Sequence, residues 1–188
     1  ALLDAFVDCA RRIHRPEGLP ADRTPSDEMA LLAVRVLIDR YNAEGRDEYL
    51  IDAIVICRRA LGASVTNFQF KLLLLQLYYM MGAQSLMQQM FQTLDVKHIL
   101  WDTLGHVIVP ASWQLGGLKM VRQASDYLVR LGRENQKDSH DYAFQAFKHG
   151  TYSKIAEFHA FERRLARSMQ LFSARCDLEA LSALDAFE

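Results

Sequence analysis

A long stretch in the middle of this sequence is almost free of charge. From residue 63 to residue 118, 56 residues carry only four formal charges, on Lys71, Asp95, Lys97 and Asp102, whereas 24% of the whole chain is charged. Because unpaired charge is costly to bury, such a stretch is expected to be enclosed by protein or covered by a partner. It is not predicted to span a membrane, because its apolar run is bounded by Lys71 and Gln76 and ends at Gly82, short of the ~20 residues that a span needs.

The overall composition gives no strong attraction to nucleic acid or to membrane surfaces. The net charge is -1 over 188 residues and the isoelectric point is near 6.7, so neither DNA nor membrane is an expected partner. The cysteines Cys9, Cys57 and Cys176 stand far apart without paired spacing, which argues against a disulfide framework or a zinc site and favours a reducing compartment. The chain begins at Ala1 and is interpreted as a piece of a longer protein.

Apolar residues at helical spacing predict helices along most of the chain. The first stripe consists of Leu2, Leu3, Phe6, Val7, Ala10 and Ile13. Residues 15–25 contain three prolines and a glycine, which predicts a loop or linker before the next helix. Ser26 is the predicted cap of that helix, and Asp27 and Glu28 are expected to complement the helix dipole in its first turn.

Four predicted helices follow between residues 26 and 94, as two consecutive pairs. The expected ends of the first three are Gly45, Gly62 and Gly82. Asp47 is the predicted cap of the second helix, and Thr66 with Gln69 has the spacing of a capping box at the start of the third. Because each pair has about the length of a 34-residue helix-turn-helix repeat, residues 26–109 are predicted to form degenerate repeats of this kind.

The third of these helices is apolar on almost all sides. Its apolar residues are Phe68, Phe70, Leu73, Leu74, Leu77, Tyr78, Met80 and Met81. A helix without a polar face is stable only when other elements cover it. We therefore expect this helix to be enclosed between its neighbours.

The C-terminal part, residues 112–188, is also predicted to be helical. Before it, residues 106–110 (His-Val-Ile-Val-Pro) are β-branched in character, but five residues cannot form a sheet alone, so the chain is predicted to be all-α. Ser112 is expected to open a helix that reaches about residue 131. A polar break is predicted over residues 132–138 and a short helix over 139–148. A long helix is predicted from about residue 153, because apolar residues keep spacings of three and four as far as Cys176.

The motifs of catalytic and cofactor-binding sites are absent from the sequence. There is no phosphate-binding glycine loop, dinucleotide fingerprint, His-Glu-x-x-His pair or nucleophile elbow. The histidines His14, His98, His106, His140, His149 and His159 have no paired metal-ligand spacing. We therefore expect no catalytic site, cofactor or metal on this chain.

The most basic part of the chain includes the last predicted long helix. Its cations are Lys148, Lys154, Arg163, Arg164, Arg167 and Arg175, against the carboxylates Glu157 and Glu162. A basic face made of Lys154, Arg163, Arg164 and Arg167 is a candidate contact to phosphate, for instance in ribosomal RNA. The alternative is a solvated helix face with ion pairs inside the helix. The aromatic residues lie on the packing stripe, so none is expected to point outward beside the cations.

Three segments carry a resemblance to a known family. They are residues 67–78, 81–83 and 94–106, and the run Lys-His-Ile-x-x-Asp-Thr-Leu-Gly that starts at Lys97 is the most specific. This pattern resembles the auxiliary, non-catalytic subunit of the N-terminal acetyltransferase B complex. The resemblance is clearest over these residues and softer from there to Leu181.

The resemblance implies a tetratricopeptide-like helical superhelix, present here as a fragment of a longer solenoid. It also implies a non-catalytic scaffold that forms a heterodimer with a small catalytic acetyltransferase subunit and helps to place it at the ribosome in the cytoplasm. Acetyl-CoA is then expected on the catalytic partner, and the substrates are nascent chains that begin Met-Asp, Met-Glu, Met-Asn or Met-Gln. Stacked repeats would leave a concave surface for that partner. The alternative function is a generic tetratricopeptide-like adaptor unrelated to acetylation.

The most specific block contains the residues predicted to bind the partner. They are Lys97, His98, Asp102, Thr103 and Gly105. Their polar groups should be hydrogen-bonded, either tying adjacent helices together or reaching the partner, and Gly105 is expected to admit a neighbouring backbone. Large apolar side chains usually fill packing gaps, so the residues expected in the core are Ile99, Trp101 and Leu104.

Overall fold

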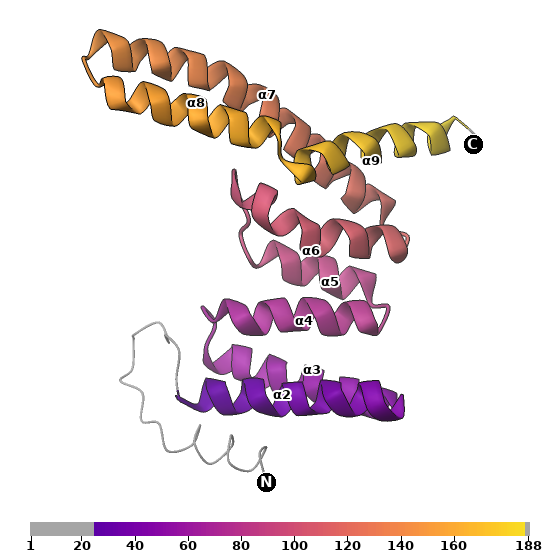
Figure 1. Ribbon diagram of the computed structural model, residues 1–188. Helices are drawn as coiled ribbons and strands as arrows, with labels where there is room; N and C mark the ends of the chain where they lie inside the picture. Colours follow the sequence, from indigo (N-terminus) through magenta and orange to yellow (C-terminus); the bar gives the residue numbers. More distant parts are fainter. Residues whose placement is uncertain (1–24, 187–188) are drawn as a thin grey trace. The chain divides into compact units, whose positions relative to one another are not determined.

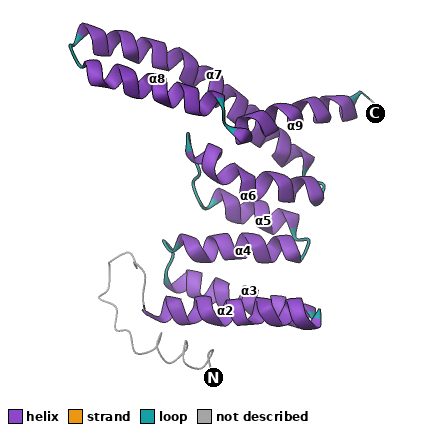
Figure 2. Cartoon of the chain, viewed as in Figure 1, coloured by secondary structure: helices purple, strands orange, loops and turns teal. Residues whose placement is uncertain are grey.

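The computed structural model describes residues 25–186 of the chain, and this part consists of helices joined by turns (Figure 1, Figure 2). The helices are α2 (Pro25–Glu44), α3 (Asp47–Ala63), α4 (Phe68–Met80), α5 (Gln84–Gln92), α6 (Leu100–Gln114), α7 (Leu118–Lys148), α8 (Tyr152–Ala166) and α9 (Met169–Asp185). Residues 25–186 contain no strand, so the predicted all-α fold is confirmed, whereas the tetratricopeptide-like repeat stays a prediction. The predicted helix over residues 2–13 and the predicted loop before Pro25 lie outside the described residues.

The chain divides into two compact units between Asp95 and Val96. In the first unit, α2 packs on α3, α3 on α4 and α4 on α5. α4 therefore lies between α3 and α5, and its side chains Phe70, Leu74 and Leu77 are completely buried. The prediction that this apolar helix is enclosed between its neighbours is confirmed.

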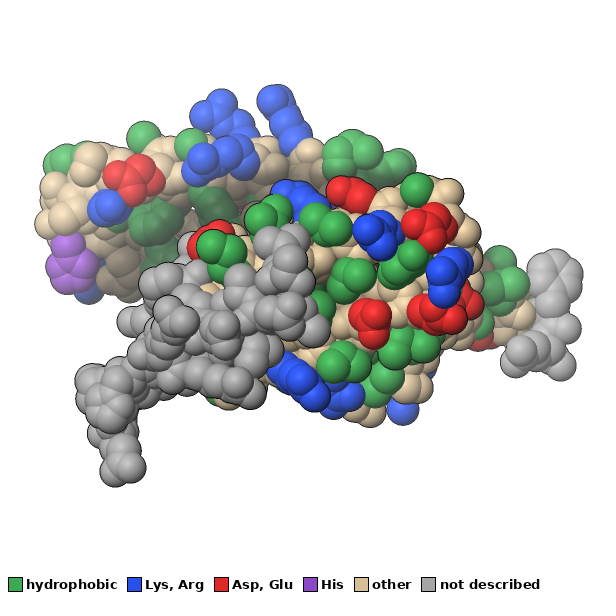
Figure 3. All heavy atoms as spheres, turned by 90° about the horizontal axis from the view of Figure 1, so that it is seen from below, with side chains coloured by type: hydrophobic (Ala, Val, Ile, Leu, Met, Phe, Trp, Pro, Cys, Tyr) green, Lys and Arg blue, Asp and Glu red, His purple; other side chains and the backbone are tan. Residues whose placement is uncertain are grey.

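The outer surface of α2 and α3 carries apolar side chains among charged ones. The exposed large apolar residues of these helices are Met29, Leu32, Val36, Ile51 and Val55. On the face seen in Figure 3, hydrophobic side chains are interspersed with acidic and basic ones. Exposed apolar residues scattered in this way are ordinary on a folded surface.

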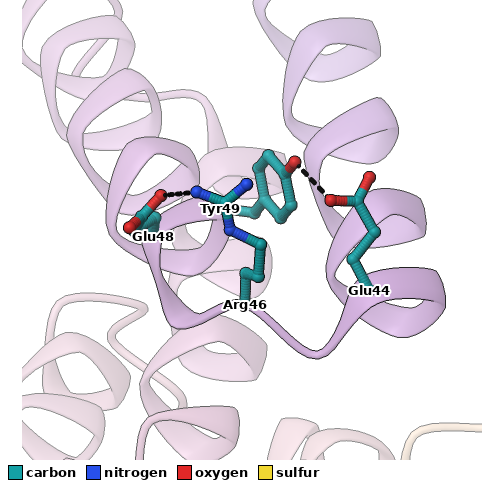
Figure 4. Close-up of polar contacts among 4 residues, drawn as sticks. All are labelled: Glu44, Arg46, Glu48 and Tyr49. Atoms are coloured by element: carbon teal, nitrogen blue, oxygen red, sulfur yellow. Dashed lines mark hydrogen bonds and ion pairs between the residues drawn. The ribbon is translucent and has the colours of Figure 1, made fainter.

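A glycine turn joins α2 to α3. Gly45 has a φ of 69°, a left-handed conformation that glycine adopts without steric cost, and the predicted helix end near this residue is confirmed. Across the turn, the hydroxyl of Tyr49 donates to Glu44 at 2.7 Å, and Arg46 pairs with Glu48 (Figure 4). All four side chains of this turn lie at the surface, where such contacts stabilise little.

The predicted caps of the first two helices are wrong in detail. α2 begins at Pro25, where the N–H that proline lacks is not needed, so Ser26 lies inside the helix. Asp47 is the first helical residue of α3, and the capping position is Arg46, whose side chain makes no cap bond. α3 also continues through Gly62, because that glycine does not take a positive φ. Each error is a shift of one or two residues at a helix end.

Asn67 caps α4 and ties it to α2, in place of the capping box predicted at Thr66. The side chain of Asn67 accepts a hydrogen bond from the N–H of Gln69 at 3.1 Å. Its amide also donates to Asp27 at 3.0 Å, and the hydroxyl of Ser64 donates to the other oxygen of the same carboxylate at 3.0 Å. Asp27 was predicted only to complement a helix dipole, yet it is a buried acceptor that joins two helices.

In the second unit, α7 contacts α6, α8 and α9, and α6 also contacts α9. The β-branched residues 106–110 lie inside α6, where Ile108 and Val109 are buried. Their strand character is overridden by packing, because β propensity depends on the surface that a residue joins.

The boundary between α6 and α7 differs from the predicted one. Ser112 is buried inside α6 instead of opening a helix, and α7 begins at Leu118. The chain reverses at Gly116, which has a φ of 73° and needs the freedom of glycine for that reason. The apolar stripe after Ser112 was assigned to one helix, although it runs across this turn.

The predicted polar break over residues 132–138 is wrong, because α7 runs without interruption through them. Gly132 packs against α9: a Cβ at this position would lie 3.0 Å from a methyl carbon of Leu171. Arg130 and Glu134 form an ion pair one turn apart at 3.9 Å. Polar residues of good helix propensity, such as glutamate, lysine and glutamine, continue a helix that is anchored in this way.

The long helix predicted from about residue 153 is two helices, α8 and α9. The break lies at Ser168, which has extended backbone angles (φ -64°, ψ 125°) and whose hydroxyl oxygen accepts from the N–H of Leu171 at 3.1 Å. Both helices pack on α7, so their apolar residues keep helical spacing on each side of the turn. Spacing alone therefore did not reveal the break.

Candidate interaction surfaces

The predicted partner-binding residues lie at the start of the second unit. Lys97 and His98 precede α6, and Asp102, Thr103 and Gly105 lie in its first turns. The side chains before the helix and that of Thr103 are exposed, Asp102 is half-buried, and Gly105 is buried. The block therefore presents only some of its members to a partner.

A tyrosine of α7 holds the turn that leads into α6. The backbone N–H of His98 donates to the hydroxyl of Tyr127 at 3.0 Å, and His98 has a φ of 49°. The centroids of the Tyr127 and Trp101 rings are 5.5 Å apart. The guanidinium carbon of Arg130 also lies 5.5 Å from the centroid of the Tyr127 ring. Trp101 therefore packs inside this unit. Ile99 is 40% exposed, so its predicted core position is wrong.

Asp102 ties the start of α6 to the start of α9. Its carboxylate accepts a hydrogen bond from the hydroxyl of Ser168, the residue that caps α9. Gly105 lies one turn further on, and a Cβ there would come 3.0 Å from Nε2 of Gln170. The close neighbour of Gly105 is thus a side chain of α9 and not the backbone that was predicted. Together these contacts hold α6 against α9.

These contacts bear on the two roles that the sequence left open for the polar residues of the block. The carboxylate of Asp102 is used inside the unit, and the hydroxyl of Thr103 donates to the carbonyl of Leu100 at 3.0 Å. Lys97 and His98 keep exposed side chains. The role of the block in binding a partner stays a prediction.

A groove that the sequence analysis missed lies between α2 and α4. Its volume is about 630 Å³, and it is lined by Glu28, Leu31, Leu32, Arg35, Ile38, Asp39, Gln69, Leu72, Leu73 and Gln76. Leucines form much of its lining, and one of them, Leu32, is 50% exposed. The sequence of α2 did contain a sign of the groove: the helix has more apolar residues than its contact with α3 buries. The sequence alone does not show which of these apolar residues line a groove, because the groove forms only when α4 packs beside α2.

The same groove contains a buried acceptor without a donor. Oε1 of Gln69 is inaccessible to solvent, and no hydrogen-bond donor within the described residues reaches it. A buried acceptor left without a partner costs about 1–3 kcal/mol.

The predicted basic face is divided by the structure. Arg163, Arg164 and Arg167 lie together beside an open groove of about 820 Å³, whose other lining residues within the described part of the chain are Glu157, Phe158, Ala160 and Phe161. Lys154 does not line this groove and pairs with Glu157 at 2.7 Å. Figure 3 shows Lys and Arg side chains projecting from the surface. A contact of this face to the ribosome stays a prediction.

The expectation that no aromatic residue points outward in this region is wrong. On the predicted packing stripe itself, Phe172 is 63% exposed. Around the turn that joins α7 to α8, Phe144, Phe147 and Tyr152 are also 67%, 63% and 62% exposed. The rings of Phe147 and Tyr152 meet edge to face at 5.8 Å. The apolar stripe of the C-terminal half of α7 is therefore only partly covered by α8.

The described residues offer little for catalysis. Burial raises the pKa of the Cys57 thiol to about 12, so this thiol stays protonated at neutral pH and is a poor nucleophile. Nowhere in residues 25–186 do three His, Cys, Asp or Glu side chains come together as metal ligands would. None of the helices in this range has the length and apolar character that crossing a membrane requires.

The sequence matches the family described as the N-acetyltransferase B complex (NatB) non catalytic subunit over residues 2–187. It is 36% identical over 159 residues to the Homo sapiens protein "N-alpha-acetyltransferase 25, NatB auxiliary subunit", a match that covers 85% of this chain and 16% of the human protein. It is 30% identical over 173 residues to the Arabidopsis thaliana "N-terminal acetyltransferase B complex auxiliary subunit NAA25". That match covers 90% of this chain and 16% of the Arabidopsis protein. The chain thus spans about a sixth of the length of these curated relatives.

Proposed function

Because the chain belongs to the family of non-catalytic subunits of the N-acetyltransferase B complex, we propose that it is part of a scaffold that binds and positions the catalytic subunit of that complex. The catalytic subunit holds acetyl-CoA and performs the transfer. The substrates are nascent chains that begin Met-Asp, Met-Glu, Met-Asn or Met-Gln, and the complex works in the cytoplasm at the ribosome. The chain belongs to an auxiliary subunit and has no catalytic site of its own.

The observation that carries this proposal is the groove between α2 and α4. Its lining combines leucines from both helices with charged residues of α2 and with amides of α4. Such a mixture is typical of protein interfaces, in which apolar anchors lie among polar groups that orient the partner.

The leucines supply most of the expected binding energy. A leucine that is fully buried contributes about 1.5–3 kcal/mol relative to an exposed one, so covering Leu32, which is half exposed, contributes about 1 kcal/mol. Leu72 and Leu73 on α4 are partly exposed and add to this when the groove is filled. Helices α2 and α4 are joined through the buried Asp27 and Asn67, so the groove exists before the partner arrives and little energy is spent on ordering it.

The test uses the full-length parent protein co-expressed with the catalytic subunit. Leu32→Ser and Leu73→Ser together should lower the amount of co-purified catalytic subunit about tenfold, because about 1.4 kcal/mol of lost binding energy corresponds to that factor. Ile51→Ser is the matched control, since Ile51 is 51% exposed on α3 but does not line the groove. Thermal unfolding of each variant separates weaker binding from a damaged fold.

The recovered complexes are then assayed with acetyl-CoA on peptides that begin Met-Asp and Ser-Ala. Acetylation of the Met-Asp peptide alone, reduced in the groove variant and normal in the control, supports the proposal. Equal recovery of the catalytic subunit with all three proteins would show that the groove is not the binding surface. If no acetyltransferase co-purifies with the unaltered protein and neither peptide is modified, the scaffold role is wrong and the adaptor function replaces it.

A further inference from the structure

Three arginines at the end of α8 lie together without a carboxylate partner. Arg163, Arg164 and Arg167 are exposed and line the groove described above, and within residues 25–186 none of them forms an ion pair with a carboxylate. The nearby carboxylates are engaged elsewhere. Glu157 binds Lys154 at 2.7 Å, and Glu162 faces His159 at 3.3 Å.

This arrangement differs from an ordinary solvated helix face. On such a face, charges of opposite sign alternate and pair at positions i and i+4. Here the three arginines pair with no carboxylate of the described residues. The same lining also contains Phe158, Ala160 and Phe161, which are half-buried. The ring of Phe158 contacts Tyr142 of α7, with 5.8 Å between the ring centroids. The described lining, all on α8 and at its C-cap, therefore combines three cations with apolar side chains.

We propose that this arginine groove, formed by Phe158, Phe161, Arg163, Arg164 and Arg167, binds an acidic peptide segment of a partner protein. The guanidinium groups pair with its carboxylates, and its apolar side chains lie on the two phenylalanines. Arginine is well suited to bind a carboxylate, because its planar guanidinium group can donate two parallel hydrogen bonds to the two carboxylate oxygens. The site lies in the second unit, and the proposal does not depend on how the catalytic subunit is bound.

The spacing of the arginines agrees with an extended acidic segment. Arg163 and Arg167 are four residues apart on consecutive helical turns, about 6 Å along the helix axis. Alternate side chains of an extended peptide are about 6.8 Å apart and lie on the same face. Two carboxylates separated by one residue can therefore reach both arginines, and apolar side chains on the same face, further along the segment, can lie on the phenylalanines.

The charge of the chain favours a peptide over RNA as the occupant. Domains that bind nucleic acid electrostatically tend to have isoelectric points above about 9, whereas this chain has a net charge of -1. Binding of single-stranded RNA relies on well-exposed aromatic faces on which successive bases stack. The exposed rings Phe144 and Phe147 do not line the groove. An acidic peptide needs only local positive charge and a short apolar surface.

The experiment measures fluorescence anisotropy with the purified full-length protein and a fluorescein-labelled dodecapeptide of Glu, Asp, Leu and Phe. The comparison peptide replaces each Glu with Gln and each Asp with Asn. We expect the acidic peptide to bind at least about tenfold more tightly than its amide version, an advantage that falls as salt is raised. The combined variant Arg163→Gln, Arg164→Gln and Arg167→Gln should remove this advantage.

Two further variants sharpen the test. Arg58→Gln is the matched control, because Arg58 is an exposed arginine of α3 that does not line the groove, and it should bind the acidic peptide normally. Glu157→Gln removes the one carboxylate among the described residues of the groove lining and should tighten binding about twofold, since a like charge disfavours an acidic ligand. An increase in affinity cannot result from a damaged fold.

The proposal is overturned if the two peptides bind equally or if the triple variant behaves as Arg58→Gln does. A labelled oligouridylate of twelve nucleotides serves as the competing probe. If the RNA binds through the three arginines and the acidic peptide does not, the groove is an RNA contact and the peptide proposal is wrong. The result is independent of the co-purification test above, because the catalytic subunit is not needed in this measurement.

Discussion

Each unit contains an aspartate in the first turn of one helix that holds the start of another helix. In the first unit, Asp27 of α2 accepts from Asn67, the cap of α4. In the second, Asp102 of α6 accepts from Ser168, the cap of α9. Both carboxylates also lie at the positive end of their own helix, where negative charge is favoured.

The two ties differ in how well water is excluded from them. Asp27 is 1% exposed and receives two donors from the segment before α4, since Ser64 also binds it at 3.0 Å. Asp102 is half-buried and has one donor from α9. When a buried acceptor is removed, its donors are left unsatisfied, whereas partly exposed donors can turn to water. The hydrogen bonds to Asp27 should therefore stabilise the first unit more than the hydrogen bond to Asp102 stabilises the second.

The largest effect is expected at Asp27. Replacing it by alanine should lower the free energy of unfolding of the first unit by about 3 kcal/mol, because the buried side chains of Ser64 and Asn67 both lose their acceptor. Native-state hydrogen exchange of α4 amides measures this change locally in a large protein. Asp52→Ala on the exposed face of α3 is the control. Unchanged protection of α4 in the Asp27 variant would show that the tie does not stabilise the unit.

A smaller effect is expected at the tie between α6 and α9. Asp102→Ala should cost about 1–2 kcal/mol, and Ser168→Ala a similar amount, because it also removes the cap of α9. The double variant should cost clearly less than the sum of the two single ones, since both remove one hydrogen bond. Exchange of α9 amides in the three variants gives the values. Additive losses would mean that the two side chains act separately.

Two glycines of the second unit test how tightly α9 is packed. Gly132→Ala should cost about 1 kcal/mol, because its Cβ would press on the buried Leu171. Gly105→Ala should stay within about 0.5 kcal/mol of the unaltered protein, since the flexible end of Gln170 can move aside and alanine favours the helix. Thermal unfolding of the two variants compares them directly. A larger loss at Gly105 would show that the α6–α9 contact is rigid.

The smallest effect is expected at the α2–α3 turn, where the polar contacts are open to water. The hydrogen bond and charge of Glu48 raise the pKa of Arg46, but an arginine is already charged throughout the usual pH range. Glu48→Gln should therefore leave the unfolding midpoint unchanged at every pH at which the protein is soluble. A measurable shift would mean that exposed pairs matter here as much as enclosed ones, and the comparison between the two aspartates would lose its basis.

Most helices of the described part could be predicted because their signals are local. Apolar spacing and the left-handed glycines placed the ends of α2 and α4 near Gly45 and Gly82. The family resemblance rested on three short segments, of which the run from Lys97 is the most specific, and the matched family confirms it. In each case the information lay within a few consecutive residues.

The errors share one physical cause. The turn at Ser168 is hidden in the sequence because α8 and α9 both pack on α7 and keep the same apolar spacing. The unbroken course of α7 through Gly132 depends on Leu171, far along the chain. The arginines of the basic face were found from the sequence, but the groove that they line was not, because a groove is formed by packing.

The sequence by itself determined the fold class, most helix positions and the family, since hydrophobic periodicity, glycine turns and a short motif need no knowledge of distant contacts. The tertiary structure decided what individual polar residues do. Asp27 and Asp102 have the sequence context of ordinary first-turn acids, yet each accepts a hydrogen bond from a residue 40 or 66 positions away. Only folding brings such donors within reach, and burial then sets how much each contact stabilises the protein.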